Sequence, residues 1–390
     1  MKEISDIIRS FDAAQLQGKK TALATVVQVE GSSYRRPGAR MLIAEDGQLT
    51  GAISGGCLEG DALRKALFVM AQQQAMLVTY NTMDEDDATI GIGLGCNGII
   101  QVLIEPIDPT NPVHPVQLLK KLTAKRQEGI LVTLFSLTDR KGFQPGTCML
   151  LDGNGNLTGT HHDLSWKNEL TDVRITCQSA FRDISDGSRT FTAFIDFVPP
   201  AIALVIAGAG NDVLPLLEIA TVLGWETTIA DGRANYAKPE RFTSACQVVV
   251  AKPDQILQHI AIDNYTVFAL MTHNYNYDKA LLAALLEKGA RLVGMLGPRK
   301  KLDRMLEEFA AEGIVFAEEQ LKAVYSPFGL DIGAETPEEI ALSIVAEIKA
   351  VLAGKPGTPL REKVAGSKPP TNPIYPPLIG SGLGLPKRRQ

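Results

Sequence analysis

The stretch PGARMLIAEDGQLTG, residues 37–51, recurs without gaps as PGTCMLLDGNGNLTG at residues 145–159. The two copies are 108 residues apart in the chain and share eight of their fifteen residues. In both, an apolar run precedes the repeat, an Asp-Gly or Asn-Gly turn interrupts it, and a strand-like segment leading into proline closes the copy. Apolar runs joined by such a turn are typical of a β-hairpin. We therefore infer that the N-terminal half of the chain contains a duplicated, β-rich unit.

The two copies differ at one place that bears on function. The first continues as Ser54-Gly-Gly-Cys-Leu-Glu59, whereas the second has His162-Asp-Leu-Ser-Trp-Lys167. A pair of glycines costs backbone entropy unless the chain needs an unusual conformation or a close approach. A copy that keeps the hairpin but loses the glycines and the cysteine keeps the fold and loses the site, so we expect the function in the first copy. The predicted domains are an N-terminal α+β domain at 1–110 and its degenerate, β-rich repeat at 111–200.

The pattern changes from Ala203 onward, where short apolar strands alternate with helical stretches. Such alternation is typical of a parallel sheet covered by helices on both faces, and it predicts a Rossmann-like, doubly wound domain at 201–353. The last helix should begin at Thr336, with Pro337 in its first turn and Glu339 completing a capping box.

The segment 354–390 is rich in proline and glycine, and its composition predicts an extended tail. We expect this tail to pack across another domain or a second copy of the chain, and for that reason we expect a homodimer.

Composition and charge exclude several classes of function. The net charge is −5 and the pI about 5.7, and no basic stretch carries interleaved aromatic residues, so nucleic-acid binding is not expected. The sequence has no uncharged apolar run of the roughly 18 residues that a membrane span needs, and its N-terminus lacks the apolar core of a signal peptide. Five cysteines, an odd number, do not form a disulfide framework. We therefore expect a protein of the reducing cytoplasm, in which any special cysteine acts as a thiol.

The clearest motif for chemistry is the turn with Gly55, Gly56, Cys57 and Glu59, where a strand leads into a helix. Amide hydrogens at the start of a helix favour negative charge, and a cysteine there has a depressed pKa and more thiolate, the form that binds metals or carries sulfur. Glu59 either complements the helix dipole or contacts a ligand. The other interpretation of the motif is a tight turn with a small, buried cysteine.

A second glycine-rich loop, GIGLGCNG at 91–98, includes Gly95 and Cys96. Such a loop lets the backbone approach a ligand and can bind an anion. We predict that Cys57 and Cys96 face one cavity, without needing to be bonded. The other three cysteines lie in strands or apolar runs and are expected in the core: Cys148, Cys177 and Cys246.

The loop before the first of these motifs supplies two hydroxyls, from Ser32 and Ser33, and two guanidinium groups, from Arg35 and Arg36. These groups suit an anion such as phosphate. A solvated loop without a ligand is the alternative.

A partial dinucleotide-binding pattern opens the C-terminal domain. Gly208 and Gly210 follow a strand, and Asp231 ends the next strand, where a ribose-binding acid would lie. However, Val213 takes the place of the third glycine, and Asp212 puts negative charge where a pyrophosphate would lie. The pattern therefore indicates the fold more than it indicates NAD(P) binding.

His273 follows the strand expected at 267–271 and should point into the crevice at the carboxyl edge of the sheet, where α/β proteins bind ligands. A histidine there suits acid–base chemistry or ligand orientation, and a structural cap is the other interpretation. Together with the glycine loop it supports an alternative function, an NAD(P)-dependent oxidoreductase with His273 as the acid–base group.

Four stretches of the chain together resemble the xanthine dehydrogenase accessory factor (XdhC/CoxI) family. They are GSSYRRPGARMLIAEDGQLTGAISGGCLEGDAL at 31–63, GLGCNGIIQVLIEP at 93–106, GMLGPR at 294–299 and SPFGLDIGAETPEEIALSI at 326–344. The first and last of these motifs are specific. The family usually has histidine after the glycine pair of the Rossmann loop, where this chain has Asn211.

The resemblance implies a maturation factor, a chaperone for a cofactor, rather than an enzyme that turns over a metabolite. Members of the family bind molybdenum cofactor (molybdopterin), favour its sulfurated form and assist its insertion into xanthine dehydrogenase-type enzymes. The implied partners are an apo molybdenum hydroxylase and proteins of cofactor biosynthesis or sulfuration. By resemblance, Cys57 and Cys96 are the candidate contacts for molybdenum or its sulfur. A third hypothesis is a scaffold that only docks the apoenzyme and the biosynthetic proteins.

Overall fold

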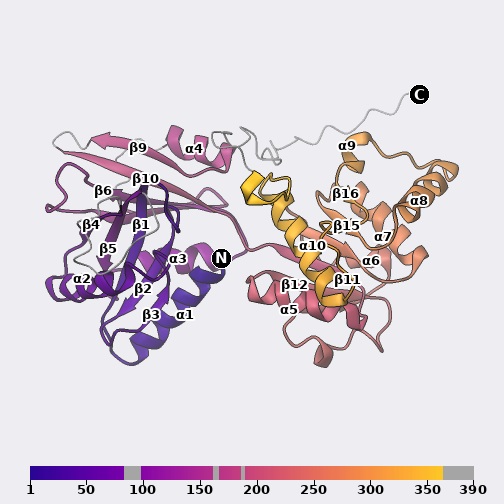
Figure 1. Cartoon of the computed structure of the whole chain (residues 1–390), viewed down its shortest axis with the longest axis horizontal. Coiled ribbons are helices and arrows are strands. Elements are labelled where there is room, and N and C mark those ends of the chain that lie inside the picture. Colours follow the sequence, from indigo (N-terminus) through magenta and orange to yellow (C-terminus); the bar gives the residue numbers. More distant parts are fainter. Residues whose placement is uncertain (83–97, 161–166, 186–188, 363–390) are drawn as a thin grey trace. The chain divides into compact units, whose positions relative to one another are not determined.

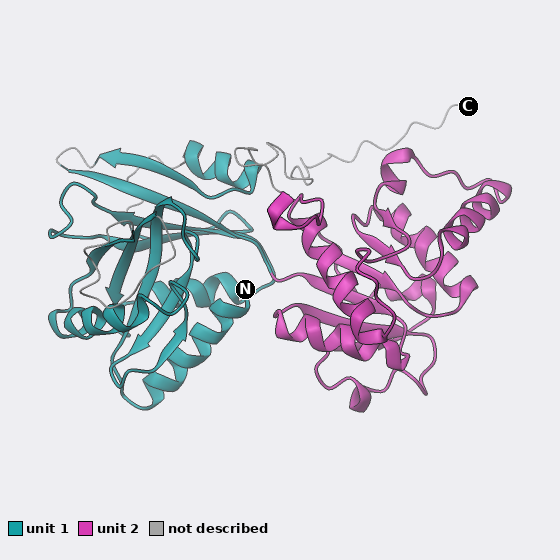
Figure 2. Ribbon diagram, in the orientation of Figure 1, with its two compact units in different colours: residues 1–200 teal, residues 201–390 magenta. Residues whose placement is uncertain are grey.

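The computed structural model describes residues 1–82, 98–160, 167–185 and 189–362. The chain divides into two compact units, Met1–Pro200 and Ala201–Gln390 (Figure 1 and Figure 2). Unit 1 combines helices with two antiparallel sheets, and unit 2 has one parallel sheet. The predicted fold class, an α+β region with an internal repeat followed by a Rossmann-like domain, is confirmed.

Unit 1 contains two five-stranded sheets with the same strand order, β3-β2-β1-β5-β4 and β8-β7-β6-β10-β9. The first copy consists of α1 (Lys2–Leu16), β1 (Thr21–Gly31), β2 (Arg40–Ala44), β3 (Leu49–Gly51), α2 (Glu59–Gln72), β4 (Met76–Asn81) and β5 (Gly98–Pro106). The second consists of α3 (Pro115–Thr123), β6 (Gly129–Phe135), β7 (Gly146–Asp152), β8 (Leu157–Gly159), α4 (Lys167–Thr176), β9 (Ala180–Ser185) and β10 (Thr190–Val198). Each copy therefore begins with a helix and uses its elements in the same order.

The strand pairing of the two copies agrees residue by residue. Leu23 of β1 pairs with Leu42 of β2, and Leu131 of β6 pairs with Leu150 of β7, at the same 108-residue offset as in the sequence. All four leucines are buried in one core cluster together with residues of α1 and α3. The opposite face of each sheet packs against its own helix, α2 or α4. Equivalent faces of the two copies thus share one interior.

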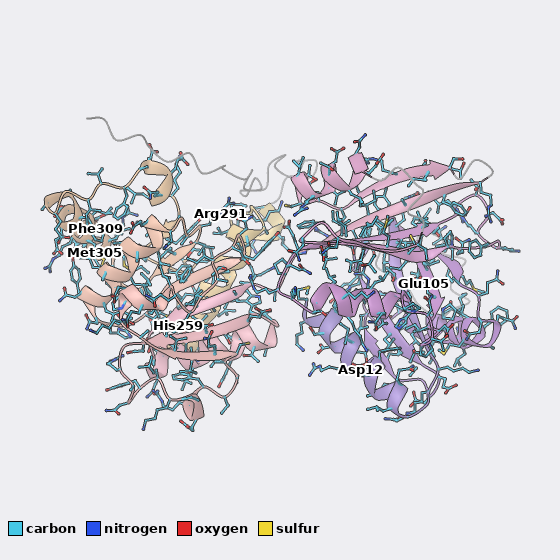
Figure 3. The ribbon with its side chains drawn as sticks, turned by 180° about the vertical axis from the view of Figure 1, so that it is seen from behind. Asp12, Glu105, His259, Arg291, Met305 and Phe309 are labelled. Carbon is cyan, nitrogen blue, oxygen red and sulfur yellow. The ribbon has the colours of Figure 1, made fainter. Side chains whose placement is uncertain are left out.

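Two buried carboxylates cross from one copy to the other. Asp196 of β10 accepts a hydrogen bond from Nη2 of Arg40 in β2 at 2.7 Å, and the two side chains are 9% and 5% exposed. Glu105 of β5, inside unit 1 (Figure 3), accepts from the backbone N–H of Thr147 at 2.6 Å and from its Oγ1 at 2.9 Å. Because buried polar groups need partners, these contacts tie the copies together.

The two glycines that begin the repeated motif explain why these carboxylates can come so close. Gly38 and its counterpart Gly146 both have φ in the left-handed region, at +92° and +84°. A Cβ at Gly38 would lie 3.2 Å from the carboxylate of Asp196, and one at Gly146 would lie 2.3 Å from Oε1 of Glu105. The repeated glycine therefore serves both the turn and the contact between the copies.

The buried Glu105 should make the stability of unit 1 depend on pH. Burial raises the pKa of Glu105 to about 7, despite the hydrogen bonds from Thr147. The pKa of Glu105 is higher in the folded state than in the unfolded state, so its burial lowers the stability little below pH ~4.5, where the side chain is protonated in both states. As the pH rises towards 7, the unfolded state loses the proton first, and the free energy of unfolding of unit 1 falls. The loss is on the order of 3 kcal/mol at 1.36 kcal/mol for each pKa unit. Glu105→Gln keeps both contacts to Thr147 without ionising, so its unfolding free energy relative to the wild type should rise by about that amount between pH 4.5 and pH 8.

Urea denaturation at several pH values measures this difference. Glu45→Gln, which changes an exposed carboxylate of the same unit, is the matched control and should give no such rise. A Glu105→Gln variant whose stability runs parallel to that of the wild type across this pH range would contradict the prediction.

Unit 2 is built on a six-stranded parallel sheet of order β13-β12-β11-β14-β15-β16, the arrangement of a doubly wound nucleotide-binding fold. Its strands are β11 (Ala203–Ala207), β12 (Glu226–Asp231), β13 (Gln247–Val250), β14 (Thr266–Leu270), β15 (Val293–Met295) and β16 (Val324–Tyr325). Its α-helices are α5 (Leu214–Val222), α6 (Pro253–Ile256), α7 (Tyr275–Glu287), α8 (Arg299–Ala311), α9 (Glu318–Leu321) and α10 (Pro337–Leu352), and its short 3-10 turns are η2 (Asn211–Val213), η3 (Pro239–Arg241) and η4 (Leu360–Glu362).

Helices cover both faces of this sheet. Buried residues of α5 and α10 pack on one face, and buried residues of α7 and α8 pack on the other, including Met305 and Phe309 of α8 (Figure 3). The start of α10 is as predicted, because Thr336 accepts a hydrogen bond from the N–H of Glu339 and the Glu339 side chain accepts one from the N–H of Thr336. In the described ranges, no helix is long and apolar enough to cross a membrane.

Candidate functional site

The first sheet gathers its functional loops at one edge. Given the antiparallel order β3-β2-β1-β5-β4, β1, β3 and β4 end at the same edge where β2 and β5 begin. Loop 31–39 and loop 52–58 therefore lie at that edge, which we call the glycine–cysteine edge. The ring of Tyr34 faces Gly55, with its Cγ 3.5 Å from the place that a Cβ on that glycine would take, so the two loops are neighbours.

A compact hydrogen-bond network shapes the turn that leads into α2. Oγ of Ser54 accepts from the N–H groups of Gly56 and Leu58, each at 3.1 Å, and donates to Glu59 at 2.5 Å. The other carboxylate oxygen of Glu59 accepts from the Ser54 N–H at 2.8 Å. Partial burial raises the pKa of Glu59, but the hydrogen bonds from Ser54 and Leu58 outweigh it and hold the pKa below its usual range. These contacts support the structural interpretation of Glu59, as a residue that holds the turn.

Cys57 lies half-buried in this turn. Its thiol is 3.6 Å from Oγ of Ser54, and part of its side chain packs against the core of the first copy. Gly56 has φ +115°, which side chains rarely adopt, and a Cβ there would meet nothing within 4 Å. Among the residues that the structure describes, the backbone N–H groups of Gly55 and Cys57 have no hydrogen-bond partner. The turn therefore offers a thiol and two free donors beside open space.

The two arginines of loop 31–39 have different surroundings. Arg35 forms an ion pair with Glu3 of α1, so its positive charge is neutralised within the protein. Arg36 is exposed, and its guanidinium has no ion-pair or hydrogen-bond partner within the described ranges. Oγ of Ser33 is buried without a partner, which makes it an orphaned polar atom in the same loop. Ser32 is exposed at the start of the loop. Of the predicted anion-binding pair, only Arg36 has an uncommitted charge.

Gly95 and Cys96 lie outside the residues that the structure describes, so a common cavity for Cys57 and Cys96 stays a prediction. The described residues on either side of 83–97 do meet. The N–H of Thr82 donates to the Gly98 carbonyl at 2.9 Å, and the Gly98 N–H donates to Oγ1 of Thr82 at 3.0 Å. Gly98 also pairs with Gly31, the last residue of β1. Thr82 and Gly98, the described residues on either side of 83–97, therefore both lie at the glycine–cysteine edge.

The expectation that three other cysteines lie in the core holds for only one of them. Cys148 is buried in β7, but Cys246 is exposed and Cys177 is half-buried. The prediction was wrong for Cys177 because this residue follows α4 with φ +53°, and for Cys246 because it lies just before β13, whose own first residue is exposed. In the described part of the chain, no group of three or more His, Cys, Asp or Glu residues could hold a metal ion.

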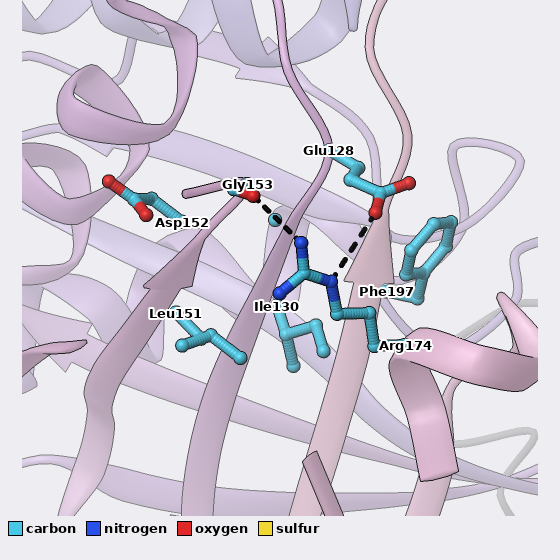
Figure 4. Close-up of a pocket in the computed structure, with 8 residues that line it drawn as sticks. Glu128, Ile130, Leu151, Asp152, Gly153, Arg174 and Phe197 are labelled. Carbon is cyan, nitrogen blue, oxygen red and sulfur yellow. Dashed lines mark hydrogen bonds and ion pairs between the residues drawn. The ribbon is translucent and has the colours of Figure 1, made fainter. Parts of the chain in front are cut away.

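A small cavity in the second copy is closed by Arg174 (Figure 4). The guanidinium donates to the Gly153 carbonyl at 2.8 Å and lies 3.7 Å from the carboxylate of Glu128. The free space is about 10 Å³, enough for one water molecule. We therefore assign no ligand to this place.

In unit 2 the glycine loop after β11 is held by its own side chains. Gly208 has φ +134°, and a Cβ there would lie 2.3 Å from the Met271 carbonyl oxygen, so the close approach of β14 requires glycine. The buried carboxylate of Asp231 accepts from the Ala209 N–H at 3.0 Å and from Arg233 at 2.7 Å. Burial raises the pKa of Asp231, but Arg233 and these donors outweigh it and leave the pKa below its usual value. The acid expected to bind a ribose is therefore engaged within the protein.

A second polar pair links the turn η2, which follows the glycine loop, to the segment after β14. Nε2 of His273 lies 2.8 Å from the carboxylate of Asp212, and His273 has φ +54°, in the left-handed region. Arg241 donates to the Ala209 carbonyl at 2.9 Å and to Oδ1 of Asn211 at 2.8 Å. Gly210 in the same loop leaves room for this carboxylate, because a Cβ at that position would lie 2.3 Å from Oδ1 of Asp212. The carboxylate of Asp212 thus lies beside the glycine loop, paired with His273.

His273 does line a cavity at the carboxyl edge of the sheet, as its position in the sequence predicts. The cavity has a volume of about 230 Å³ and is lined by Asp231, Gly232, Arg233, Thr272, His273, Asn274 and Tyr277. Below it, Asp278 is fully buried and accepts from Oγ1 of Thr272 at 2.5 Å and from Nζ of Lys301 at 2.7 Å. The lysine in the first turn of α8 therefore neutralises a buried acid.

Local sequence patterns missed the contacts that join distant segments. Three pairs had no signal in the sequence, because tertiary packing brings their members together: Tyr34 facing Gly55, Arg35 with Glu3, and Lys301 with Asp278. The one usable signal was the charge of Asp212, which already disfavoured a bound pyrophosphate.

Comparisons with known proteins agree with this architecture. Residues 14–81 match the model of the XdhC and CoxI family, and residues 204–348 match that of the XdhC Rossmann domain. A Bacillus subtilis (strain 168) protein, named as a probable xanthine dehydrogenase component, is 32% identical over 339 residues, covering 87% of this chain and 95% of that protein. The Escherichia coli (strain K12) protein named molybdenum cofactor insertion chaperone PaoD is 23% identical over 345 residues, covering 88% and 87%. A crystal structure described as a xanthine dehydrogenase from Bacillus halodurans superposes with a TM-score of 0.71 at 31% identity, covering 93% of this chain and 98% of that one.

Proposed function

This chain belongs to the XdhC and CoxI family, and from that premise we propose that it binds molybdenum cofactor and assists its insertion into a xanthine dehydrogenase-type apoenzyme. The relative named as a molybdenum cofactor insertion chaperone, which matches most of this chain, supports a role in maturation. The finer parts of the proposal are that the cofactor is carried in sulfurated form, that cofactor biosynthesis or sulfuration proteins deliver it, and that the protein acts as a homodimer in the cytoplasm.

The observation that carries the proposal is a set of groups at the glycine–cysteine edge that have no partner among the described residues. Molybdopterin has a terminal phosphate, a flat pterin and a metal held by two sulfur atoms. Arg36, the orphaned hydroxyl of Ser33 and the free N–H groups of Gly55 and Cys57 suit the phosphate and the polar edge of the pterin. The residues present therefore fit the group.

Within this site the protein's own residues bind and protect. The Ser54–Glu59 network fixes the turn, so the donors of Gly55 and Cys57 are held in place before any ligand arrives. We propose that Cys57, with Cys96, handles sulfur or contacts molybdenum, since a thiolate is the form that does either. The bound cofactor supplies the molybdenum centre that the client enzyme uses.

Two other functions remain as alternatives with weaker support. An NAD(P)-dependent oxidoreductase would use the loop of Gly208 and Gly210. However, Asp231, the acid expected to bind a ribose, is already hydrogen-bonded to Ala209, and Asp212 adds a negative charge beside the loop. A scaffold that only docks partners would need no uncommitted thiol.

Cys57→Ser should separate these functions. The variant keeps the size and the hydrogen bond of the side chain but lacks the thiolate, so activation of a co-expressed apoenzyme should fall at least tenfold. Mass spectrometry of the purified protein should find less retained pterin. Cys246→Ser, an exposed cysteine of unit 2, is the matched control and should behave like the wild type.

Full activation by the variants Cys57→Ser, Cys96→Ser and their combination would favour the scaffold. Binding of NAD(P) with hydride transfer, and no retained pterin, would favour the oxidoreductase.

A further inference from the structure

Tyr34 is an exposed aromatic side chain at the glycine–cysteine edge, and it belongs to none of the hydrophobic cores formed by the described residues. Its side chain is 73% exposed, and its hydroxyl has no hydrogen-bond partner within the described part of the chain. It contributes to none of the buried clusters of unit 1. A tyrosine held in this way adds little to the stability of the core.

The position of the Tyr34 ring is nevertheless defined. Its atoms Cγ, Cδ1 and Cδ2 lie 3.5, 3.7 and 3.7 Å from the place of a Cβ on Gly55. Three ring atoms at nearly equal distances from that position mean that the ring turns one face towards Gly55. Since most of the side chain is exposed, the opposite face is open to solvent.

Two other side chains of the glycine–cysteine edge suit other parts of the same ligand. Cys57 follows two residues after Gly55, and the unpaired guanidinium of Arg36, within the described ranges, is two residues from Tyr34 in the same loop. An aromatic face binds a flat, conjugated ring, whereas a guanidinium binds an anion and a thiolate binds a soft metal or sulfur. The three side chains thus offer contacts for a flat ring, an anion and a metal–sulfur group at one edge.

We propose that Tyr34 is the platform on which the pterin ring of the bound cofactor stacks, with Gly55 supporting the other face of the tyrosine. This inference rests on the proposed function and names a residue that recognises the ring system. The contact uses the face of the tyrosine ring and not its hydroxyl. Stacking of a heterocycle on an aromatic side chain is sensitive to truncation but tolerant of exchange between aromatic residues.

Fluorescence titration of the full-length protein with 6-hydroxymethylpterin monophosphate, a stable pterin that carries a phosphate, tests the proposal. Tyr34→Ala should weaken binding about tenfold or more and reduce the quenching of pterin fluorescence, whereas Tyr34→Phe should bind within about twofold of the wild type. Inorganic phosphate, used as a competitor, probes the anion contacts alone, and its affinity should be the same for the wild type and Tyr34→Ala.

Phe143→Ala is the matched control, because Phe143 is an exposed aromatic in the corresponding loop of the second copy, which lacks the glycines and the cysteine. Its pterin affinity should equal that of the wild type. Equal pterin affinity of Tyr34→Ala and wild type, or an equal loss in Phe143→Ala, would overturn the inference. If the wild type binds no pterin but activation still depends on Cys57, the platform is wrong and the maturation role stands. If neither pterin binding nor dependence on Cys57 is found, the proposed function fails as well.

Discussion

Arg40→Met is expected to lower the unfolding free energy of unit 1 by about 3–5 kcal/mol, because it leaves the carboxylate of Asp196 buried without its countercharge. Asp196 would keep only the hydrogen bond from Oγ of Ser179 at 3.1 Å, among the described residues. The side chains of Arg40 and Asp196 are 5% and 9% exposed, so water cannot replace the lost partner. In calorimetry of the full chain, the transition of unit 1 should move down by about 10 °C.

The double variant Arg40→Met/Asp196→Leu distinguishes a stranded charge from a lost contact. Removing both charges should recover most of the stability, since a well-packed apolar pair can replace a buried ion pair at little cost. Lys19→Met is the exposed control, because it breaks the more accessible pair with Asp46 at 2.6 Å, and it should cost less than about 1 kcal/mol. A cost for Arg40→Met as small as that of Lys19→Met would contradict the prediction.

Lys301→Met is expected to have an effect of similar size in unit 2. Asp278 is fully buried, and its side chain accepts hydrogen bonds from Oγ1 of Thr272 and Nζ of Lys301. Without the lysine, a carboxylate would remain in the interior beneath the crevice with one hydroxyl as its donor, at a cost of about 3–5 kcal/mol. The transition of unit 2 should therefore occur at a lower temperature, while that of unit 1 stays unchanged.

Two further variants check the cause. Lys322→Met breaks an ion pair with Glu319 in which both side chains are exposed, 60% and 81%, so it should change the stability by less than about 0.5 kcal/mol. Asp278→Asn in the Lys301→Met background should regain part of the loss, because an amide keeps the bond to Thr272 and carries no charge. If this second change restores nothing, the stranded charge is not the cause.

The fold followed from the sequence wherever short-range patterns decide the structure. The repeat at 37–51 and 145–159 predicted two similar hairpins, and it did so because their pairing depends on turn chemistry and alternating apolar residues. The capping box at Thr336 is local in the same way, and the structure has it as predicted. Alternating strands and helices after Ala203 were enough to give the parallel sheet, since few topologies satisfy that pattern.

The candidate site was less predictable, because its electrostatics depend on residues distant in sequence. Nothing near Arg35 in the chain shows that Glu3 neutralises it and leaves Arg36, within the described ranges, free. The burial of a cysteine also depends on tertiary packing, and Cys246 is exposed because it precedes β13, an outer strand whose first residue is exposed as well. Sequence thus located the turn of Cys57, and the structure showed which neighbouring groups are uncommitted.

The shared interior of unit 1 has a consequence for how the duplicated halves could diverge. Two separate chains of an ordinary dimer must find each other in solution, whereas these halves are covalently joined and meet at a permanently high effective concentration. On the proposed function, the second half has lost the ligand-binding residues. It still supplies apolar surface and buried polar partners to the first half. Unit 1 is thus equivalent to an asymmetric dimer of two covalently linked halves, in which we propose that one half binds the ligand and the other stabilises the fold.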